Sequence, residues 1–156
     1  MEGVRPVLAE IQALVVPSSF GNPRRVSNGV EYNRAMLLLA VLEKRGGLLL
    51  GNCDAYLNVI GGLSLDEPAA DLAAMLALAS SFRDKPVPSD LAAIGEVGLT
   101  GELRAVSNLG QRLSEVRRLG FTKCLIPKRI QGKLAAPEGL ELIRVANIRE
   151  ALAALL

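Results

Sequence analysis

The chain has 156 residues, of which half are hydrophobic and 22% are charged. A chain of this length can bury a sizeable core, and its ordinary share of charged residues argues against wholesale disorder. The formal net charge of +2 is too small to indicate a nucleic-acid partner by itself. The sequence contains no histidine, which excludes histidine-based acid–base catalysis and the common zinc sites that need histidine ligands.

Cysteine usage indicates a reducing compartment, and hydropathy argues against a signal peptide or a membrane span. Cys53 and Cys124 are too few for a metal cluster, and we expect both to be free thiols. The first residues show no basic segment followed by an apolar one, so no signal peptide is expected. The longest apolar stretch, residues 68–82, carries Asp71 and two serines and falls short of the roughly 20 residues of a membrane span. We therefore expect a cytoplasmic protein without membrane contact.

The first half of the chain predicts a strand, a loop, a helix and a second strand. Residues 7–16 form a nearly continuous apolar run typical of a strand, and residues 18–29 carry the turn signals of a loop. Residues 31–45 predict a helix that a Gly-Gly pair ends, and residues 54–60 alternate as a strand should.

The second half continues this alternation of helices and strands. The predicted helices cover residues 68–82, 109–119 and 148–156, with Gly120 as the C-cap of the second. The predicted strands cover residues 91–94, 102–106, 123–126 and 140–145, and the first two flank a glycine-spaced turn that suggests a hairpin. Residues 128–139 are expected to form a surface loop. The alternation places the chain in the α/β class, as one domain.

Two of the predicted helices, 31–45 and 68–82, are apolar almost all the way round. A helix of that kind must be covered on most sides, and a small domain has room in its core for about one of them. The second helix is either buried in the same core or lies at a subunit interface.

The glycine-rich stretch Gly95, Gly98 and Gly101 superficially resembles a phosphate-binding loop. A strand rather than a helix follows it, so no helix N-terminus is available to hold an anion. We interpret these glycines as turn residues. The P-loop pattern G-x-x-x-x-G-K-[ST] is also absent, so no ATP site is expected in this chain.

Acidic and hydroxyl side chains have local structural explanations. Asp66 and Glu67 immediately precede a predicted helix, and we expect Asp66 to be its N-cap rather than a catalytic acid. Ser80 and Ser81 lie near the end of the same helix, where hydroxyls commonly bond the backbone.

The basic residues occur in several small groups, and most are expected to be solvated surface. Arg24 and Arg25 are the exception, because they lie in a predicted Pro/Asn/Gly loop without apolar neighbours. Paired guanidinium groups suit phosphate oxygens.

Two blocks of sequence resemble the proteolytic domain of the Lon protease family. They are residues 66–73, Asp-Glu-Pro-Ala-Ala-Asp-Leu-Ala, and residues 95–103, Gly-Glu-Val-Gly-Leu-Thr-Gly-Glu-Leu. The resemblance aligns Ala69 with the nucleophilic serine of the family and Gly110 with the lysine that activates it. Both members of the dyad are missing, so we expect no catalytic residues and no protease activity in this chain.

Longer runs, in order along residues 3–156, resemble the C-terminal Lon-like domain of the RadA (Sms) family of bacterial DNA repair proteins. Among them are residues 3–15, 22–26, 58–62, 68–73 and 95–104. The resemblance implies one Lon-like domain, residues 1–156, with small mixed sheets packed with helices. It also implies a longer parent protein, whose zinc finger and RecA-like ATPase lie outside this sequence. ATP, Mg²⁺ and Zn²⁺ would be held there, so no cofactor or metal is expected here.

The same resemblance implies a function in homologous recombination and DNA repair. Proteins of this family resemble hexameric ring motors that drive branch migration with ATP. Their Lon-like domain is expected to assemble the ring and to contact DNA without sequence preference. The residues that we expect to bind DNA, chosen for charge and loop placement, are Arg24, Arg25 and Arg104, followed by Arg5, Arg45 and Arg112.

Two other functions remain open at this point. One is an oligomerisation scaffold without DNA contact, which would show no DNA binding that depends on Arg24 and Arg25. The other is an active Lon-type peptidase, which would cleave an unfolded protein and lose that activity on substitution of a serine.

Overall fold

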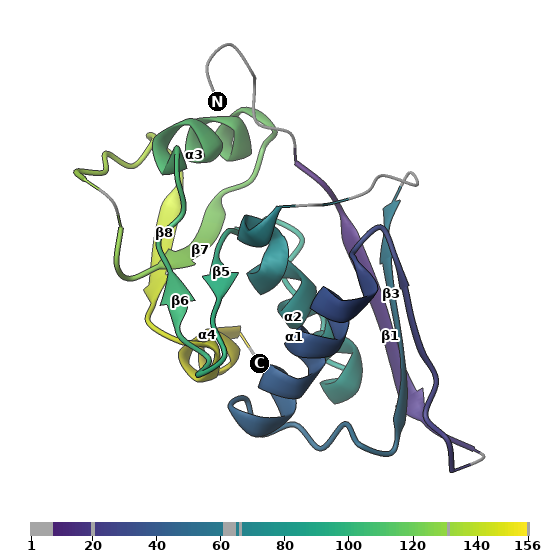
Figure 1. Ribbon diagram of the computed structural model, residues 1–156. Helices are drawn as coiled ribbons and strands as arrows, with labels where there is room; N and C mark the ends of the chain where they lie inside the picture. Colours follow the sequence, from purple (N-terminus) through teal and green to yellow (C-terminus); the bar gives the residue numbers. More distant parts are fainter. Residues whose placement is uncertain (1–7, 20, 61–64, 66, 131, 156) are drawn as a thin grey trace.

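The fold is described from a computed structural model, which describes residues 8–19, 21–60, 65, 67–130 and 132–155. Two three-stranded sheets and a short hairpin pack with four α-helices in an α/β arrangement (Figure 1). The predicted fold class is thereby confirmed.

The first sheet lies on the right of Figure 1 and has the strand order β1-β3-β2. Strand β1 (Ile11–Pro17) is antiparallel to β3 (Cys53–Val59), and β2 (Arg25–Asn28) is parallel to it. Ala55 and Leu57 are buried, whereas Leu14 on β1 is 53% exposed. The sheet therefore covers the core with one face and leaves β1 partly open to solvent.

The second sheet is parallel throughout and has the order β4-β7-β8. Its strands are β4 (Leu91–Ala93), β7 (Lys123–Pro127) and β8 (Glu141–Val145). Leu125 of β7 packs in the larger core cluster, and its neighbour Cys124 packs in a second cluster. The central strand is thus buried on both faces, as expected for a parallel sheet between helices.

Helices cover the two faces of this second sheet. The side chains of α3 (Leu109–Arg118) join the cluster of Cys124, and those of α4 (Ile148–Leu155) join the cluster of Leu125. The hairpin of β5 (Glu96–Val97) and β6 (Leu103–Arg104) connects β4 to α3.

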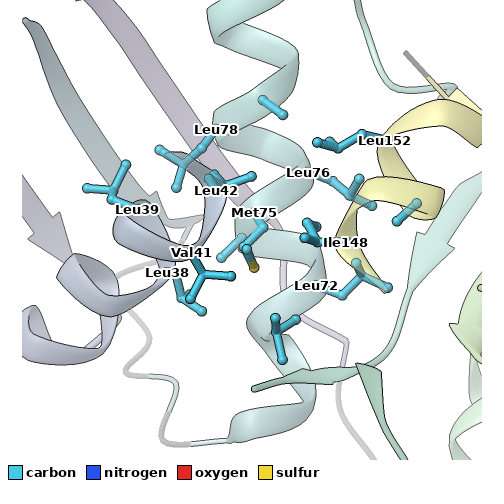
Figure 2. Close-up of a cluster of buried hydrophobic side chains, with 14 of the residues drawn as sticks. Leu38, Leu39, Val41, Leu42, Leu72, Met75, Leu76, Leu78, Ile148 and Leu152 are labelled. Carbon is cyan, nitrogen blue, oxygen red and sulfur yellow. The ribbon is translucent and has the colours of Figure 1, made fainter. Parts of the chain in front are cut away.

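The larger core forms around α2 (Asp71–Arg83), which continues from the short 3₁₀ helix η2 (Pro68–Ala70). Helix α1 (Tyr32–Lys44) packs on one side of α2, and α4 packs on another (Figure 2). Leu72, Met75 and Leu78 of α2 are at most 1% exposed. Helix α2 is therefore the helix that the core encloses, while Tyr32 and Ala40 of α1 remain exposed.

Several predictions about local structure were wrong. Residues 25–28, predicted as part of a loop, form β2, because the edge of β3 pairs with them in parallel. The predicted hairpin between strands 91–94 and 102–106 does not form. Strand β4 pairs with β7, and β6 pairs with β5 instead, a two-residue strand too short to show in the sequence pattern.

Helix ends also differ slightly from the prediction. Leu119 is the C-cap of α3, and Gly120 follows it with φ +98°. Glu67 caps η2 through a hydrogen bond from the backbone N–H of Ala69. Asp66, the predicted N-cap, lies outside the described residues, as does residue 7, the first of the strand predicted over 7–16. Residues 8–10 are not in a strand, which the structure begins at Ile11.

Asp71, at the start of α2, ties three elements together. Its side chain is 4% exposed and forms a two-point ion pair with Arg34 of α1. It also accepts a hydrogen bond of 3.1 Å from the backbone N–H of Val97 in β5. The hydrogen bond to Asp71 raises the pKa of Arg34 above its ordinary value, so the guanidinium stays charged.

We expect Asp71→Ala to lower the free energy of unfolding by about 2–3 kcal/mol, because it leaves Arg34 and the Val97 N–H without their acceptor. Arg34 is 34% exposed, which keeps the loss below that of a fully buried pair. Urea unfolding followed by circular dichroism measures the effect. Glu141→Ala removes an exposed carboxylate and should change stability by no more than about 0.5 kcal/mol. If Asp71→Ala lowered the free energy of unfolding no more than Glu141→Ala, the stabilising role given to the Asp71 contacts would be wrong.

The two cysteines are free thiols in different environments. Cys124 is fully buried, and this burial raises its pKa to about 12, whereas Cys53 is partly exposed. Because the thiolate is the reactive form, we expect one rapid thiol reaction at pH 8 in the native protein and a second only on unfolding. A disulfide-exchange reagent measures both, and Cys53→Ser should remove the rapid phase. Rapid labelling of that variant would show that Cys124 is accessible.

Candidate functional site

The position aligned with the Lon nucleophile is a buried methyl group. Ala69 lies in the middle of η2 and is 5% exposed. Its backbone N–H donates to Glu67 Oε1 at 3.2 Å, and its carbonyl accepts from the Gly95 N–H at 2.9 Å. Its side chain belongs to the smaller core cluster, which also contains Leu109 of α3. The backbone of this segment is held firmly, but it presents no oxygen that could attack a substrate.

The position aligned with the activating lysine is Gly110, the second residue of α3. It is exposed, and a Cβ built there would have no other heavy atom within 4 Å. The preceding residue, Leu109, packs in the same cluster as Ala69. The fold therefore brings the two aligned positions to neighbouring parts of η2 and α3, although neither has a functional group.

An ion pair spans the two elements at this place. Arg112 of α3 lies with its Nη2 atom 3.6 Å from Glu67 Oε2, and its Nε donates to the Ser107 carbonyl at 2.9 Å. The Arg112 side chain is only 16% exposed. The guanidinium thus connects α3 to the N-cap of η2, in a contact that the sequence did not indicate.

Other hydroxyl groups near the core already have structural partners. Ser81 Oγ accepts from the Val15 N–H of β1 at 2.8 Å, and Ser80 Oγ donates to the Lys85 carbonyl at 2.5 Å. Ser107, just before α3, and Ser114, within α3, are both exposed. Ser64 lies outside the described residues.

A pocket of about 220 Å³ lies between the start of α1 and η2. Its charged lining residues include Glu31, which caps α1, and Glu67, Arg34 and Asp71, which are in the ion pairs already described. In the part of the chain that the structure describes, no group of three or more Cys, Asp or Glu residues could hold a metal ion. The site therefore contains neither a nucleophile and base nor a candidate metal centre among the described residues.

The residues predicted to bind DNA do not form one cluster. Arg24 is exposed before β2, and its backbone N–H donates to Asp54 Oδ1 at 2.7 Å. Arg25 is partly buried, and its Nη2 donates to the Leu50 carbonyl at 2.8 Å. Arg24 and Arg25 accordingly lie at the edge of the first sheet rather than in a free loop.

The other predicted residues belong to other surfaces. Arg45 is exposed at the end of α1, and its carbonyl accepts from Arg149 of α4. Arg104 of β6 is 55% exposed and lies 3.7 Å from Glu102, whose pKa is lowered by a hydrogen bond from Thr100. Arg112 takes part in the η2–α3 contact, and Arg5 lies outside the described residues.

We expect Gly110→Ala to raise the free energy of unfolding by about 0.5 kcal/mol, because alanine favours a helix and the space beside Gly110 is open. Gly101→Ala is the matched control. Gly101 has φ +82°, and its Cβ would lie 2.9 Å from Arg45 Cβ, so this change should destabilise the protein by at least about 1 kcal/mol. Urea unfolding measures both. A destabilising Gly110→Ala would show that glycine is required there by the fold.

Within the described part of the chain, none of the helices combines the length and the apolar character that a bilayer crossing needs.

The chain is similar to known proteins along nearly its whole length. The chain is similar to the DNA repair protein RadA of Bacillus subtilis (strain 168), with 57% identity over 152 residues, which make up 97% of this chain and 33% of that protein. It is 52% identical over 152 residues to the DNA repair protein RadA of Streptococcus pneumoniae (strain ATCC BAA-255 / R6), covering 97% of this chain and 36% of that protein. The chain thus spans about a third of the length of these relatives.

The family comparison concerns the part of the chain that contains η2 and α3. The Lon protease (S16) C-terminal proteolytic domain matches residues 54–156, which include most of β3, positions 69 and 110 and the whole second sheet. This match covers more than half of the chain. The chain therefore belongs to the family of Lon protease (S16) C-terminal proteolytic domains.

Proposed function

We propose that this chain is a non-proteolytic Lon-fold domain of a RadA-type DNA repair protein, and that it binds DNA without sequence preference and assembles with copies of itself. The observation that carries the proposal is the similarity to DNA repair proteins RadA over 97% of the chain. In this proposal the whole protein works in the cytoplasm in homologous recombination, as an ATP-driven branch-migration ring. Its ATP, Mg²⁺ and Zn²⁺ sites would lie in other domains.

The absence of a dyad supports a non-proteolytic role. A serine protease of the Ser–Lys type needs a hydroxyl and an amine within hydrogen-bond reach of each other. Ala69 and Gly110 supply neither, and the Arg112–Glu67 ion pair lies between their elements. The domain is therefore suited to a binding role on a protease fold.

Phosphate binding is the chemistry that the exposed arginines support. Arg24, Arg45 and Arg104 are exposed, so their guanidinium groups can reach a polyanion, while Arg25 and Arg112 hold local structure as well. Each phosphate neutralised by such a residue contributes about 0.9 to the slope of log K against log salt concentration. Copies in a ring would multiply a modest number of contacts per domain.

Self-assembly has a structural candidate in the outer face of α1. Tyr32 is 53% exposed, Ala40 is exposed, and Leu37 is partly exposed on this helix. Apolar residues on an outer helix face suit a contact between subunits. The sequence left open whether the second apolar helix is buried in the core or lies at a subunit interface, and α1 is the candidate for the interface.

We expect the domain to bind a 20-base-pair duplex of mixed sequence weakly at low salt, and to lose binding as salt rises. Arg24→Ala/Arg25→Ala should reduce the log–log salt slope by up to about 1.8, since two phosphate contacts are lost. Fluorescence anisotropy measures binding, and light scattering with and without DNA measures the assembly. Arg83→Ala/Lys85→Ala removes the same charge elsewhere and should leave the slope unchanged. Undetectable binding by the wild-type chain would favour a scaffold without DNA contact.

A further inference from the structure

Charge is distributed very unevenly along this chain. Residues 103–149 contain ten basic and three acidic residues, a net charge of +7, whereas residues 1–102 contain eight basic and twelve acidic residues, a net charge of −4. The total of +2 conceals this asymmetry. Opposite charge on two parts of one chain is a typical indication of a polyanion partner for the basic part.

The fold keeps the basic part together. Residues 103–149 form β6, α3, β7 and β8, which lie on the left of Figure 1, away from the sheet of β1 and β3. One of the three acidic residues, Glu115, is buried and paired with Arg118. The basic part therefore makes up most of one side of the molecule, although β5 pairs with β6 there and Glu102 lies 3.7 Å from Arg104.

Several exposed basic residues of this part lie in or near the loop between β7 and β8. Lys128, Arg129 and Lys133 of the loop are all exposed. The Lys128 N–H donates to the Val145 carbonyl at 2.8 Å, which places Lys128 beside the end of β8, and the preceding residue of β8 is the exposed Arg144.

Arg104 of β6 lies near the same end of β8. The N–H of Leu103 donates to the carbonyl of Ala146 at 2.9 Å, so β6 runs next to the residues that follow β8. Two chain segments that carry exposed basic residues thus meet at the carboxyl end of β8.

Arg117 of α3 anchors the far end of the loop. Its Nε donates to the Glu138 carbonyl at 3.1 Å, and its guanidinium lies over the backbone of Gly139. A Cβ at Gly139 would lie 2.7 Å from Arg117 Nε, and Gly139 has φ +85°, so only glycine allows this approach without strain. The loop is therefore attached to the domain at both ends.

We infer that Arg104, Lys128, Arg129, Lys133 and Arg144 form one nucleic-acid-binding surface, here termed the basic loop surface, and that it binds the phosphate backbone. The inference rests on the proposed function and adds a DNA-binding surface to the contacts of Arg24 and Arg25 considered there. Phosphate contacts need exposed cations, which this surface provides from three segments of the chain.

The chemistry of the surface also predicts how it binds. Residues 122–156 contain no aromatic residue, so the segments that form most of the surface have no platform on which a base could stack. Binding through phosphate charge alone should be independent of sequence and steeply dependent on salt. Single strands and duplexes of mixed sequence should both bind.

The test compares two triple variants of equal charge loss. Lys128→Ala/Arg129→Ala/Lys133→Ala should lower the log–log salt slope for a 20-base-pair duplex by about 2–3 and weaken binding at low salt at least tenfold. Lys44→Ala/Arg83→Ala/Lys85→Ala removes three exposed basic residues from the acidic part of the chain and should change the slope by less than about 1. Fluorescence anisotropy at five salt concentrations gives the slopes, and circular dichroism verifies that each variant is folded.

The outcomes separate this inference from the proposed function. Equal binding by the wild-type chain and the loop variant would overturn the basic loop surface while leaving DNA binding intact. Absence of wild-type binding at low salt would overturn both. If the triple loop variant does not fold, Arg129→Glu alone should still weaken binding, and unchanged binding by that variant would contradict the inference. A fixed preference for one base sequence would also contradict it.

Discussion

The buried carboxylate of Asp71 is the contact on which the arrangement of this domain depends. It lies at the first residue of α2 and joins that helix to α1 through Arg34 and to β5 through the Val97 N–H. A charge taken out of water must be compensated by charge and hydrogen bonds, and here each compensating group comes from a different element. Because α2 is the helix around which the core packs, fixing its first turn also fixes η2, which precedes it.

The domain belongs to a protease family, and the two positions expected for a catalytic dyad are alanine and glycine. The Gly95 N–H donates to the Ala69 carbonyl of η2, and Ala69 and Leu109 of α3 pack in the same core cluster, so η2 and α3 are held in one packed unit. These contacts are needed for folding whether or not a serine is present. The space beside Gly110 is open, so the fold needs no side chain at that position, whereas the methyl group of Ala69 is buried in the smaller core cluster. An ion pair between Arg112 and Glu67 now connects the two elements.

Charge is distributed unevenly over the fold. The acidic residues are concentrated in the part of the chain that builds the first sheet and the two large helices, and the basic residues in the part that builds α3 and the second sheet. A small net charge can therefore coexist with a strongly basic side. The proposed binding of phosphates depends on this basic side, whose field extends over about a Debye length.

Much of the fold followed from local signals in the sequence, and the remainder did not. The helices 31–45 and 68–82 were predicted to within a few residues, because apolar periodicity and end signals are local. Strand β2 was missed, because its four residues are mostly polar and form a strand only through pairing with β3. The hairpin between β4 and β6 was wrong for a similar reason, since strand partners are chosen by long-range packing.

By itself, the sequence determined the α/β class, the absence of a nucleophile at position 69 and the uneven distribution of charge, because these are properties of residue type and order. Only the tertiary structure decided that Arg34 neutralises Asp71, that Arg112 reaches Glu67 and that Arg104 lies near the loop after β7. Those pairs are separated by many residues along the chain. They come into contact because the burial of apolar side chains brings distant segments together, and local sequence patterns do not predict such contacts.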